Sequence, residues 1–228
     1  MSADQQPPRF SVPDLVIAER EGGYARGRAG YEAIVHAALD LLIEEGYRAI
    51  SIRKVATRCG LSAGNVSYYF PTREGLVRVL LDAIIRSYES EFDVILHDPA
   101  LAPTRKLADI CTLILEDIGT KKTTRVFPEL WALSNHDAFV YERMHELYAR
   151  ARVSLEVLIA EINPALPELD RADLALFMSA SMEGMTVFAG HEKPFAARMA
   201  QLTRITVAGF VHLAQSYAPG EGAALAKG

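Results

Sequence analysis

Residues 59–74, CGLSAGNVSYYFPTRE, contain the first candidate for chemistry in the chain. Gly60, Ser62 and Gly64 have the spacing G-x-S-x-G, in which a serine hydrolase raises its nucleophile on a strained turn between a strand and a helix. The residues before Gly60 have a helical pattern, and no convincing period-two run would supply a sheet. A five-residue match is also a weak signal by itself. The sequence therefore gives little support to a hydrolase.

The same stretch fits a tight turn that leads into a DNA-reading helix. In a helix-turn-helix, two short helices cross at a steep angle, and the second presents polar residues to the major groove. Gly60 can take a positive φ in the turn, Ala56 is small where the helices approach, and Leu61 and Val66 can anchor the second helix. The residues left to face outward are Ser62, Ala63, Gly64, Asn65, Ser67 and Tyr68. Asn65 can form two hydrogen bonds with an adenine edge.

The charge distribution agrees with a local DNA-binding module. The whole chain of 228 residues carries a formal net charge of -5, so any attraction for DNA must come from a patch. Residues 46–73 contain no acidic residue, and they contain the basic residues Arg48, Arg53, Lys54, Arg58 and Arg73. Free backbone N–H groups at helix starts near Ser51 and Ser62 suit phosphate oxygens. Tyr69 and Arg73 are expected to contact phosphates on the far side of the helix.

Two other groups of residues could bind a metal. Glu142-x-x-His145 is half of a di-iron carboxylate motif, but the chain has no second copy, which favours a solvated helix face. The pairs His97-Asp98 and His136-Asp137 are typical of helical metal-dependent phosphohydrolases, yet both fall at predicted helix ends, where such residues form caps. An all-α metal-dependent enzyme using Glu142/His145 or His136/Asp137 is the alternative function.

The elements that must position these residues are all helical. Besides a short possible helix over Val12–Glu19, the spacing of apolar residues, caps and breakers predicts helices over 28–46, 52–59, 62–69, 72–97, 104–119, 125–135, 137–162, 170–190 and 194–217. The predicted fold is all-α, with an N-terminal three-helix helix-turn-helix domain joined by a long helix to a C-terminal helical domain. The predicted divisions are a flexible arm (1–26), a DNA-binding domain (27–73), a ligand-binding and dimerisation domain (74–218) and a flexible tail (219–228).

Cysteine usage and hydropathy predict a cytoplasmic protein. Cys59 and Cys111 lie far apart inside apolar helical patterns, which favours buried thiols in a reducing compartment. The N-terminus lacks the basic start and apolar run of a secretory signal. No stretch approaches the ~18 apolar residues that a membrane helix needs.

Residues 28–81 resemble the N-terminal DNA-binding domain of the TetR family of bacterial transcriptional repressors. The matching features are Glu44 to Tyr47 (EEGY), Ser51, Val55-Ala56, Gly60 to Gly64, Tyr69-Phe70 and Thr72 to Leu76. Two positions depart from the family pattern, because Ser67 replaces a frequent tyrosine and Arg73 replaces the usual lysine. The first departure leaves the base sequence that is read undetermined.

The residues and the resemblance together imply a homodimeric repressor that binds double-stranded DNA at a palindromic operator and is released by a small, mainly apolar effector. No cofactor and no metal are expected. The predicted DNA-binding residues are Arg28, Ser51, Arg53, Lys54, Ser62, Ala63, Gly64, Asn65, Ser67, Tyr68, Tyr69, Thr72 and Arg73.

The C-terminal half provides candidates for an effector cavity and a dimer interface. Flexible methionines and flat aromatic rings line adaptable apolar pockets, and the predicted ligand-binding residues are Phe127, Trp131, Phe139, Met178, Met182 and Met185. An ordinary core is the alternative for these residues. The predicted dimer interface combines small and apolar residues of the last two helices, namely Ala180, Gly184, Met199, Leu202, Thr206, Gly209, Phe210 and Leu213. Packing within one chain is the alternative for this second group.

Overall fold

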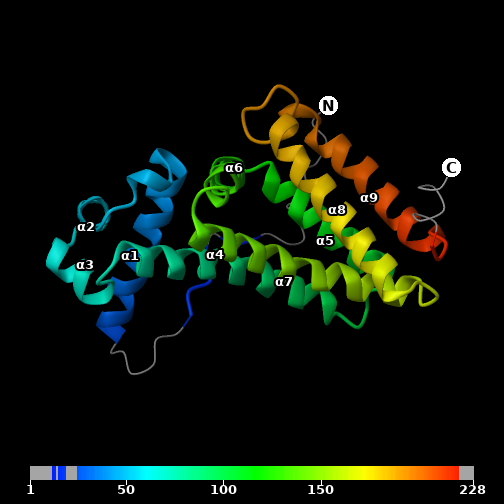
Figure 1. Ribbon diagram of the computed structural model, residues 1–228, viewed down its shortest axis with the longest axis horizontal. Helices are drawn as coiled ribbons and strands as arrows, with labels where there is room; N and C mark the ends of the chain where they lie inside the picture. The colour runs from blue at the N-terminus through cyan, green and yellow to red at the C-terminus, as the bar shows by residue number, and fades with distance from the viewer. Residues whose placement is uncertain (1–11, 14, 19–24, 221–228) are drawn as a thin grey trace.

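The computed structural model describes residues 12–13, 15–18 and 25–220, and within these ranges the protein is α-helical without a β-strand (Figure 1). The predicted fold class is therefore confirmed. A small N-terminal group of helices is connected by one long helix to a larger C-terminal group. No helix in the described ranges is long and apolar enough to cross a membrane.

The N-terminal helices begin and end where the caps in the sequence indicate. They are α1 (Ala25–Glu45), α2 (Ile52–Cys59), α3 (Ala63–Tyr69) and the long α4 (Arg73–Leu96). The side chains of Ser51, Ser62 and Thr72 accept hydrogen bonds from the first turns of α2, α3 and α4. Gly60 ends α2 with φ 72°, a left-handed conformation that glycine adopts without strain. A short 3-10 helix, Tyr47–Ala49, which the apolar pattern does not predict, connects α1 to α2.

The C-terminal helices are α5 (Pro103–Ile118), α6 (Lys121–Ser134), α7 (Ala138–Ile162), α8 (Glu168–Ala189) and α9 (Met199–Ser216). Two of them differ from the predicted ranges. Helix α6 begins four residues earlier than expected, because the Thr120 hydroxyl caps its first turn by accepting from the Thr123 N–H. Helix α9 begins later, because the preceding residues form turns and the 3-10 helix Ala196–Arg198.

Two apolar clusters hold these helices together. The first joins buried residues of α1 to α4 with Val126, Phe127 and Leu130 of α6 and with Val140 and Met144 of α7. The second joins the C-terminal end of α4 to α5, α7, α8 and α9. The DNA-binding helices thus share one core with α6 and the start of α7, which couples them mechanically to the C-terminal half. Both cysteines are free thiols, and Cys111 is buried.

The described residues before α1 pack against both clusters. Val12 contacts the second cluster, whereas Leu15 and Ile17 contact the first. The Val16 N–H donates to the Ala83 carbonyl of α4 at 3.1 Å. Residues 12–13 and 15–18 are not helical, so the short helix expected over Val12–Glu19 is wrong for them. The remaining residues of the predicted arm before α1, and residues 221–228 of the predicted tail, lie outside the described residues.

Candidate nucleic-acid interface and effector cavity

Helix α3 has one buried side and one polar exposed side. Val66 is completely buried against the first apolar cluster and fixes the rotation of the helix. Ser62, Ala63, Gly64, Asn65, Ser67 and Tyr68 are all exposed. Tyr68 is 75% exposed, so its ring and hydroxyl are available to a partner on this side of the helix. This surface is the arrangement that a helix entering the major groove requires.

The turn and the caps around α3 explain its position. Ser62 Oγ accepts from the Asn65 N–H at 3.1 Å, so the serine of the G-x-S-x-G pattern serves as a helix cap and not as a raised nucleophile. Tyr69 is half-buried and its ring lies edge-on to Tyr31 of α1, with ring centroids 6.3 Å apart. A side chain at Gly30 would come within 3.3 Å of the Tyr69 hydroxyl. Tyr69 therefore packs α3 against α1, and its phosphate contact stays a prediction.

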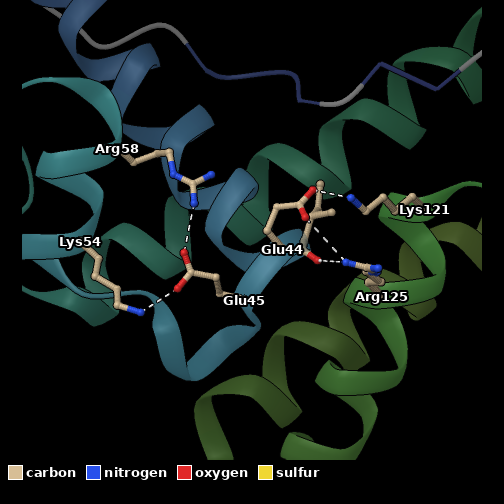
Figure 2. Close-up of polar contacts among 7 residues, drawn as sticks. Glu44, Glu45, Lys54, Arg58, Lys121 and Arg125 are labelled. Carbon is tan, nitrogen blue, oxygen red and sulfur yellow. Dashed lines mark hydrogen bonds and ion pairs between the residues drawn. The ribbon is translucent and has the colours of Figure 1, made fainter.

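The basic residues of α2 differ in how freely they can meet DNA. Glu45 of α1 binds both Lys54 Nζ, at 2.7 Å, and an Arg58 guanidinium nitrogen, at 3.1 Å (Figure 2). The hydrogen bond from Lys54 and the charges of Lys54 and Arg58 outweigh desolvation and lower the pKa of Glu45. Arg53 is exposed and forms no ion pair in the described part of the chain. Of the predicted contacts on α2, Arg53 is thus the least neutralised.

The other predicted phosphate-facing residues cap or flank these helices. Ser51 Oγ accepts from the Lys54 N–H at 3.3 Å, and Thr72 Oγ1 accepts from the Gly75 N–H at 3.0 Å. Arg28 is exposed on α1 and forms an ion pair with Glu32 at 2.8 Å. Their DNA contacts stay predictions.

Arg73 is partly buried and its guanidinium is bound within the protein, so its phosphate contact stays a prediction. Its Nε donates to the Ile50 carbonyl at 2.8 Å, and its Nη2 donates to the Tyr47 carbonyl at 3.0 Å. The guanidinium also lies 4.3 Å from the centre of the Tyr47 ring. The sequence did not indicate this because the acceptors are backbone carbonyls more than twenty residues away. Arg73 connects the start of α4 to the segment between α1 and α2.

Helix α6 contacts the same segment from the opposite domain. Glu129 Oε1 accepts from the Tyr47 N–H at 2.8 Å. Nearby, Lys121 and Arg125 of α6 pair with Glu44 of α1 (Figure 2). The hydrogen bond from Lys121, assisted by its charge and that of Arg125, lowers the pKa of Glu44. These contacts tie α6 to the end of α1.

A cavity of about 50 Å³ lies among α4, α5, α6, α7 and α8. Of the predicted ligand-binding residues, Phe127 and Met182 line it. Trp131 does not, but its indole N–H donates to the hydroxyl of the lining residue Tyr148 at 2.7 Å. The structure places the other three elsewhere, because Phe139 packs beside Arg78 and against the first cluster, and Met178 and Met185 pack in the second. The other aromatic residues of the lining are Tyr88 and Phe92.

Glu89 and Glu183 line the cavity, and a third carboxylate, Asp117, lies behind the lining residues Tyr88 and Thr123. Asp117 and Glu89 have partners within the chain. Asp117 accepts hydrogen bonds from the Tyr88 and Thr123 hydroxyls, both at 2.5 Å, and lies 3.5 Å from Lys122 Nζ. Burial, and then the Asp117 carboxylate, raise the pKa of Tyr88 well above its usual value. Glu89 forms an ion pair with Arg150. Both carboxylates are therefore compensated without a ligand.

Glu183 of α8 is the remaining carboxylate, and it lacks such compensation. Its Oε2 is buried and has no hydrogen-bond partner, and no ion pair to it occurs among the described residues. Burial raises the pKa of Glu183 to about 7, the Tyr148 hydroxyl offsets part of this rise, and the Asp117 carboxylate adds to it. Sequence reasoning missed this residue, although Glu183 is the only charged residue between Asp173 and His191.

The predicted dimer residues divide into two groups. Ala180, Gly184 and Gly209 are exposed, and Leu202, Thr206 and Leu213 are partly buried. Met199 and Phe210 belong to the second apolar cluster, with exposed fractions of 9% and 6%. These two cannot form a large part of an interface, because α9 turns them toward its own chain. The other six stay predictions.

The residues of the metal hypothesis serve other purposes. Glu142 and His145 are exposed on α7, where the His145 ring lies 4.1 Å from the Tyr141 ring. Asp137 caps α7 by accepting from the Phe139 and Val140 N–H groups, and Asp98 accepts from the Ala100 N–H. In the described ranges, no group of three or more His, Cys, Asp or Glu side chains is placed to hold a metal ion.

A short helix with a polar outer face, set after a glycine turn and carried by a basic three-helix unit, defines a helix-turn-helix DNA-binding protein. The family model described as bacterial regulatory proteins, tetR family, matches residues 34–80, and the model described as BetI-type transcriptional repressor, C-terminal, matches residues 103–212. The chain belongs to the TetR family of transcriptional regulators, which are not enzymes.

Individual relatives agree with this assignment. An uncharacterized HTH-type transcriptional regulator in the dhlA 5′ region of Xanthobacter autotrophicus is 28% identical over 151 residues, which are 64% of this chain and 71% of that protein. The HTH-type transcriptional regulator BetI of Klebsiella pneumoniae (strain 342) is 25% identical over 175 residues, 74% of this chain and 86% of its own. A transcriptional regulator from Saccharomonospora viridis, solved in complex with choline, has a TM-score of 0.61 at 19% identity and covers 79% of this chain and 96% of its own, which supports the fold.

Replacing Asn65 and Arg53 by alanine should separate base reading from phosphate binding. We expect Asn65→Ala to lose about 1–3 kcal/mol of discrimination at one base pair of each half-site. Arg53→Ala should weaken binding to all sequences by a similar factor and reduce the slope of log affinity against log salt by about 1 per protomer. Binding measured on a panel of single-base variants at several salt concentrations tests both. Equal loss at every base for Asn65→Ala would contradict its assignment.

Replacing Arg73 by alanine should lower stability more directly than DNA affinity. The substitution leaves the Tyr47 and Ile50 carbonyls without their charged donor, and we expect a loss of about 2 kcal/mol of unfolding free energy. Arg73→Lys should recover only part, because an ammonium cannot reproduce the planar contact with the Tyr47 ring. Chemical unfolding of the three proteins measures this. Unchanged stability together with weakened DNA binding would contradict the structural role and support the phosphate clamp.

Proposed function

We propose that this protein is a repressor that binds a palindromic operator as a homodimer and is released by a small organic cation. The observation that carries the proposal is the exposed face of α3, where Asn65 and Tyr68 face outward while Val66 anchors the helix. A two-fold dimer can set two such helices about 34 Å apart, one turn of DNA, so that each reads a half-site.

The cavity supports an effector that is small and largely apolar. About 50 Å³ is far below the ~300–1,000 Å³ of sites for drug-sized ligands, so a large ligand would need extensive rearrangement. Most of the lining is aliphatic or aromatic, as the sequence led us to expect. The flexible Met182 side chain can adjust to a modest guest.

Glu183 supports a positive charge on that effector. The cavity already neutralises Asp117 and Glu89 from within the chain, whereas Glu183 Oε2 has no partner. A cation beside Glu183 would recover the electrostatic free energy that burial costs the carboxylate. The rings of Tyr88, Phe92 and Phe127 suit a methylated ammonium, which is held by aromatic faces and needs no hydrogen-bond acceptor. The solved relative with bound choline agrees with this class of ligand.

Helix α6 connects the cavity to the helices that bind DNA. Thr123 and Phe127 line the cavity, and Glu129 of the same helix binds the Tyr47 N–H beside α2. An effector that moves α4 and α6 would therefore change the separation of the two α3 helices. The coupling must be reciprocal, so operator DNA weakens effector binding by the same factor.

Selection from a random DNA pool tests the repressor proposal. We expect enriched sequences to be palindromic, with half-site centres separated by about 10 base pairs or a multiple of that spacing. The selection is carried out in parallel without effector and with excess choline. We expect choline to decrease the enrichment. Enrichment of single, unpaired half-sites would contradict the dimeric operator, and enrichment of no sequence would contradict specific DNA binding.

Choline and its neutral carbon isostere, 3,3-dimethylbutan-1-ol, test the charge of the effector. We expect choline to bind more tightly, and its affinity to rise roughly tenfold from pH 6 to pH 8 as Glu183 with a pKa of about 7 ionises. The isostere should show no such rise. Tyr148, Glu89 and Arg150 line the same cavity, and Asp117 lies close enough to influence Glu183. Glu183→Gln should remove the pH dependence, which identifies Glu183 as the titrating group. Calorimetric titration measures all of these, and equal affinities for both compounds would exclude a role for charge.

Glu183→Gln also gives a readout without ligand. A carboxyl group whose pKa is raised on folding stabilises the protein below its unfolded pKa of about 4.5 and loses that contribution as pH rises through about 7. At pH 8 we expect Glu183→Gln to be more stable than the wild type, by up to about 3 kcal/mol, and the difference should vanish near pH 4. Unfolding curves at both pH values measure the difference, and a variant that is less stable at pH 8 would contradict an uncompensated Glu183.

A further inference from the structure

A short extended segment before α1 contacts both apolar clusters. We call residues 12–13 and 15–18 the N-terminal strap (Figure 1). Val12 packs against the second cluster, whereas Leu15 and Ile17 pack against the first. Among the described residues, α4 and α7 are the only helices that contribute to both clusters. The strap is therefore a third connection between the DNA-binding helices and the helices that form the cavity.

One backbone hydrogen bond fixes the strap on α4. The Val16 N–H donates to the Ala83 carbonyl at 3.1 Å. Ala83 is 2% exposed and lies in the interior of α4, where each carbonyl also accepts the helical hydrogen bond from the residue four positions later. A carbonyl oxygen has two lone pairs and can accept both bonds. The strap can therefore detach from α4 and return without disrupting the helix.

The residues of the strap favour an extended chain that binds reversibly. Pro13 fixes its own φ, and it restricts the preceding Val12 to extended conformations. This restriction lowers the conformational entropy that ordering the strap costs. Val12, Leu15 and Ile17 are only partly buried, so their apolar contacts stabilise the attached strap by a modest amount. A segment held in this way can respond to a movement of the helices beneath it.

From these contacts we propose that the N-terminal strap raises the concentration of effector needed to release DNA. The proposal rests on the proposed function, in which an effector moves α4 and α6. The cavity of about 50 Å³ is nearly closed in the arrangement that the strap holds, so the strap favours the effector-free state. Moving one cluster relative to the other must break the contacts of Val12 or those of Leu15 and Ile17. The strap then weakens effector binding by the same factor by which it favours this arrangement.

Amide hydrogen exchange tests the strap without effector or DNA. We expect the Val16 amide to exchange at least about tenfold more slowly than in an unstructured chain, because it is bound to Ala83. Val12→Ser should free the end of the strap at the second cluster. The Tyr47 amide, which binds Glu129 of α6 and lies in the first cluster, should then exchange at least about threefold faster.

Val94→Ser is the matched control, because it removes the same apolar atoms from a residue that is 57% exposed on α4. It should leave the exchange of Val16 and Tyr47 unchanged. Exchange is measured at several low urea concentrations, because the rate of local opening hardly depends on urea whereas that of global unfolding rises steeply. An unprotected Val16 amide in the wild type, or a local opening of Tyr47 that Val12→Ser does not accelerate, would overturn the proposal.

Release of the selected operator by choline tests the regulatory effect. We expect the choline concentration at half-release to fall at least about threefold in Val12→Ser and in Leu15→Ser. The double variant should fall little further, because the strap connects the clusters only while both ends are attached. Circular dichroism and thermal unfolding establish that the variants are folded.

Two results of the release experiment would count against the strap. Unchanged half-release in the folded variants, or single effects that add fully in the double variant, would overturn the proposal, because the strap would then stabilise the fold without favouring one arrangement. A wild-type protein that binds the operator and is not released by choline would instead contradict the cationic effector of the proposed function. In that case a protected Val16 amide and accelerated local opening of Tyr47 in Val12→Ser still support the strap.

Discussion

The backbone of Tyr47 is held from two sides, and the position of the DNA-reading helix depends on this. Its N–H donates to Glu129 of α6, and its carbonyl accepts from Arg73 at the start of α4. Gly46 makes the first contact possible, because with φ 86° it brings the chain so close that a Cβ atom would lie 2.9 Å from the Glu129 carboxylate. Since α2 and α3 follow directly, these contacts connect both α4 and α6 to the helix-turn-helix.

The polar contacts at this junction fix the orientation of α6 relative to α1, whereas apolar burial supplies most of the free energy that holds the two helices together. The side chains in the ion pairs of Lys121 and Arg125 with Glu44 are 40–46% exposed, and ion pairs this exposed to solvent contribute little to stability. Val126 and Leu130 of α6 are buried in the same cluster as Leu41 and Leu42 of α1, and each such side chain contributes about 1.5–3 kcal/mol. Helix α6 is therefore held to α1 mainly by apolar packing, which salt does not screen.

The sequence predicts local features of this fold well and long-range contacts poorly. Ser51, Gly60, Ser62 and Thr72 define the starts and ends of α2 to α4 because caps and turns act within a few residues. The role of Arg73 could not be predicted, since its partners are carbonyls of another segment. Helix α9 is apolar on several sides, so periodicity alone could not decide that Phe210 faces its own chain. Aromatic and methionine content leads us to expect either an apolar cavity or an ordinary core, and it does not reveal a single buried carboxylate such as Glu183.

In the proposed function, the small cavity and the buried Glu183 carboxylate together limit how an effector can act. An effector changes the protein only through a difference in its affinity for two arrangements, and a cavity of about 50 Å³ favours the arrangement in which the site is nearly empty. Admitting an ammonium group must separate α4, α6, α7 and α8, and well-packed cores shift as units and do not expand evenly. Phe127 belongs both to the cavity lining and to the core shared with α1, so space made for the effector is taken from the contact that orients the DNA-binding domain. In this proposal the buried Glu183 carboxylate would supply free energy for the displacement, because the attraction between a cation and this carboxylate is strongest where both are shielded from water.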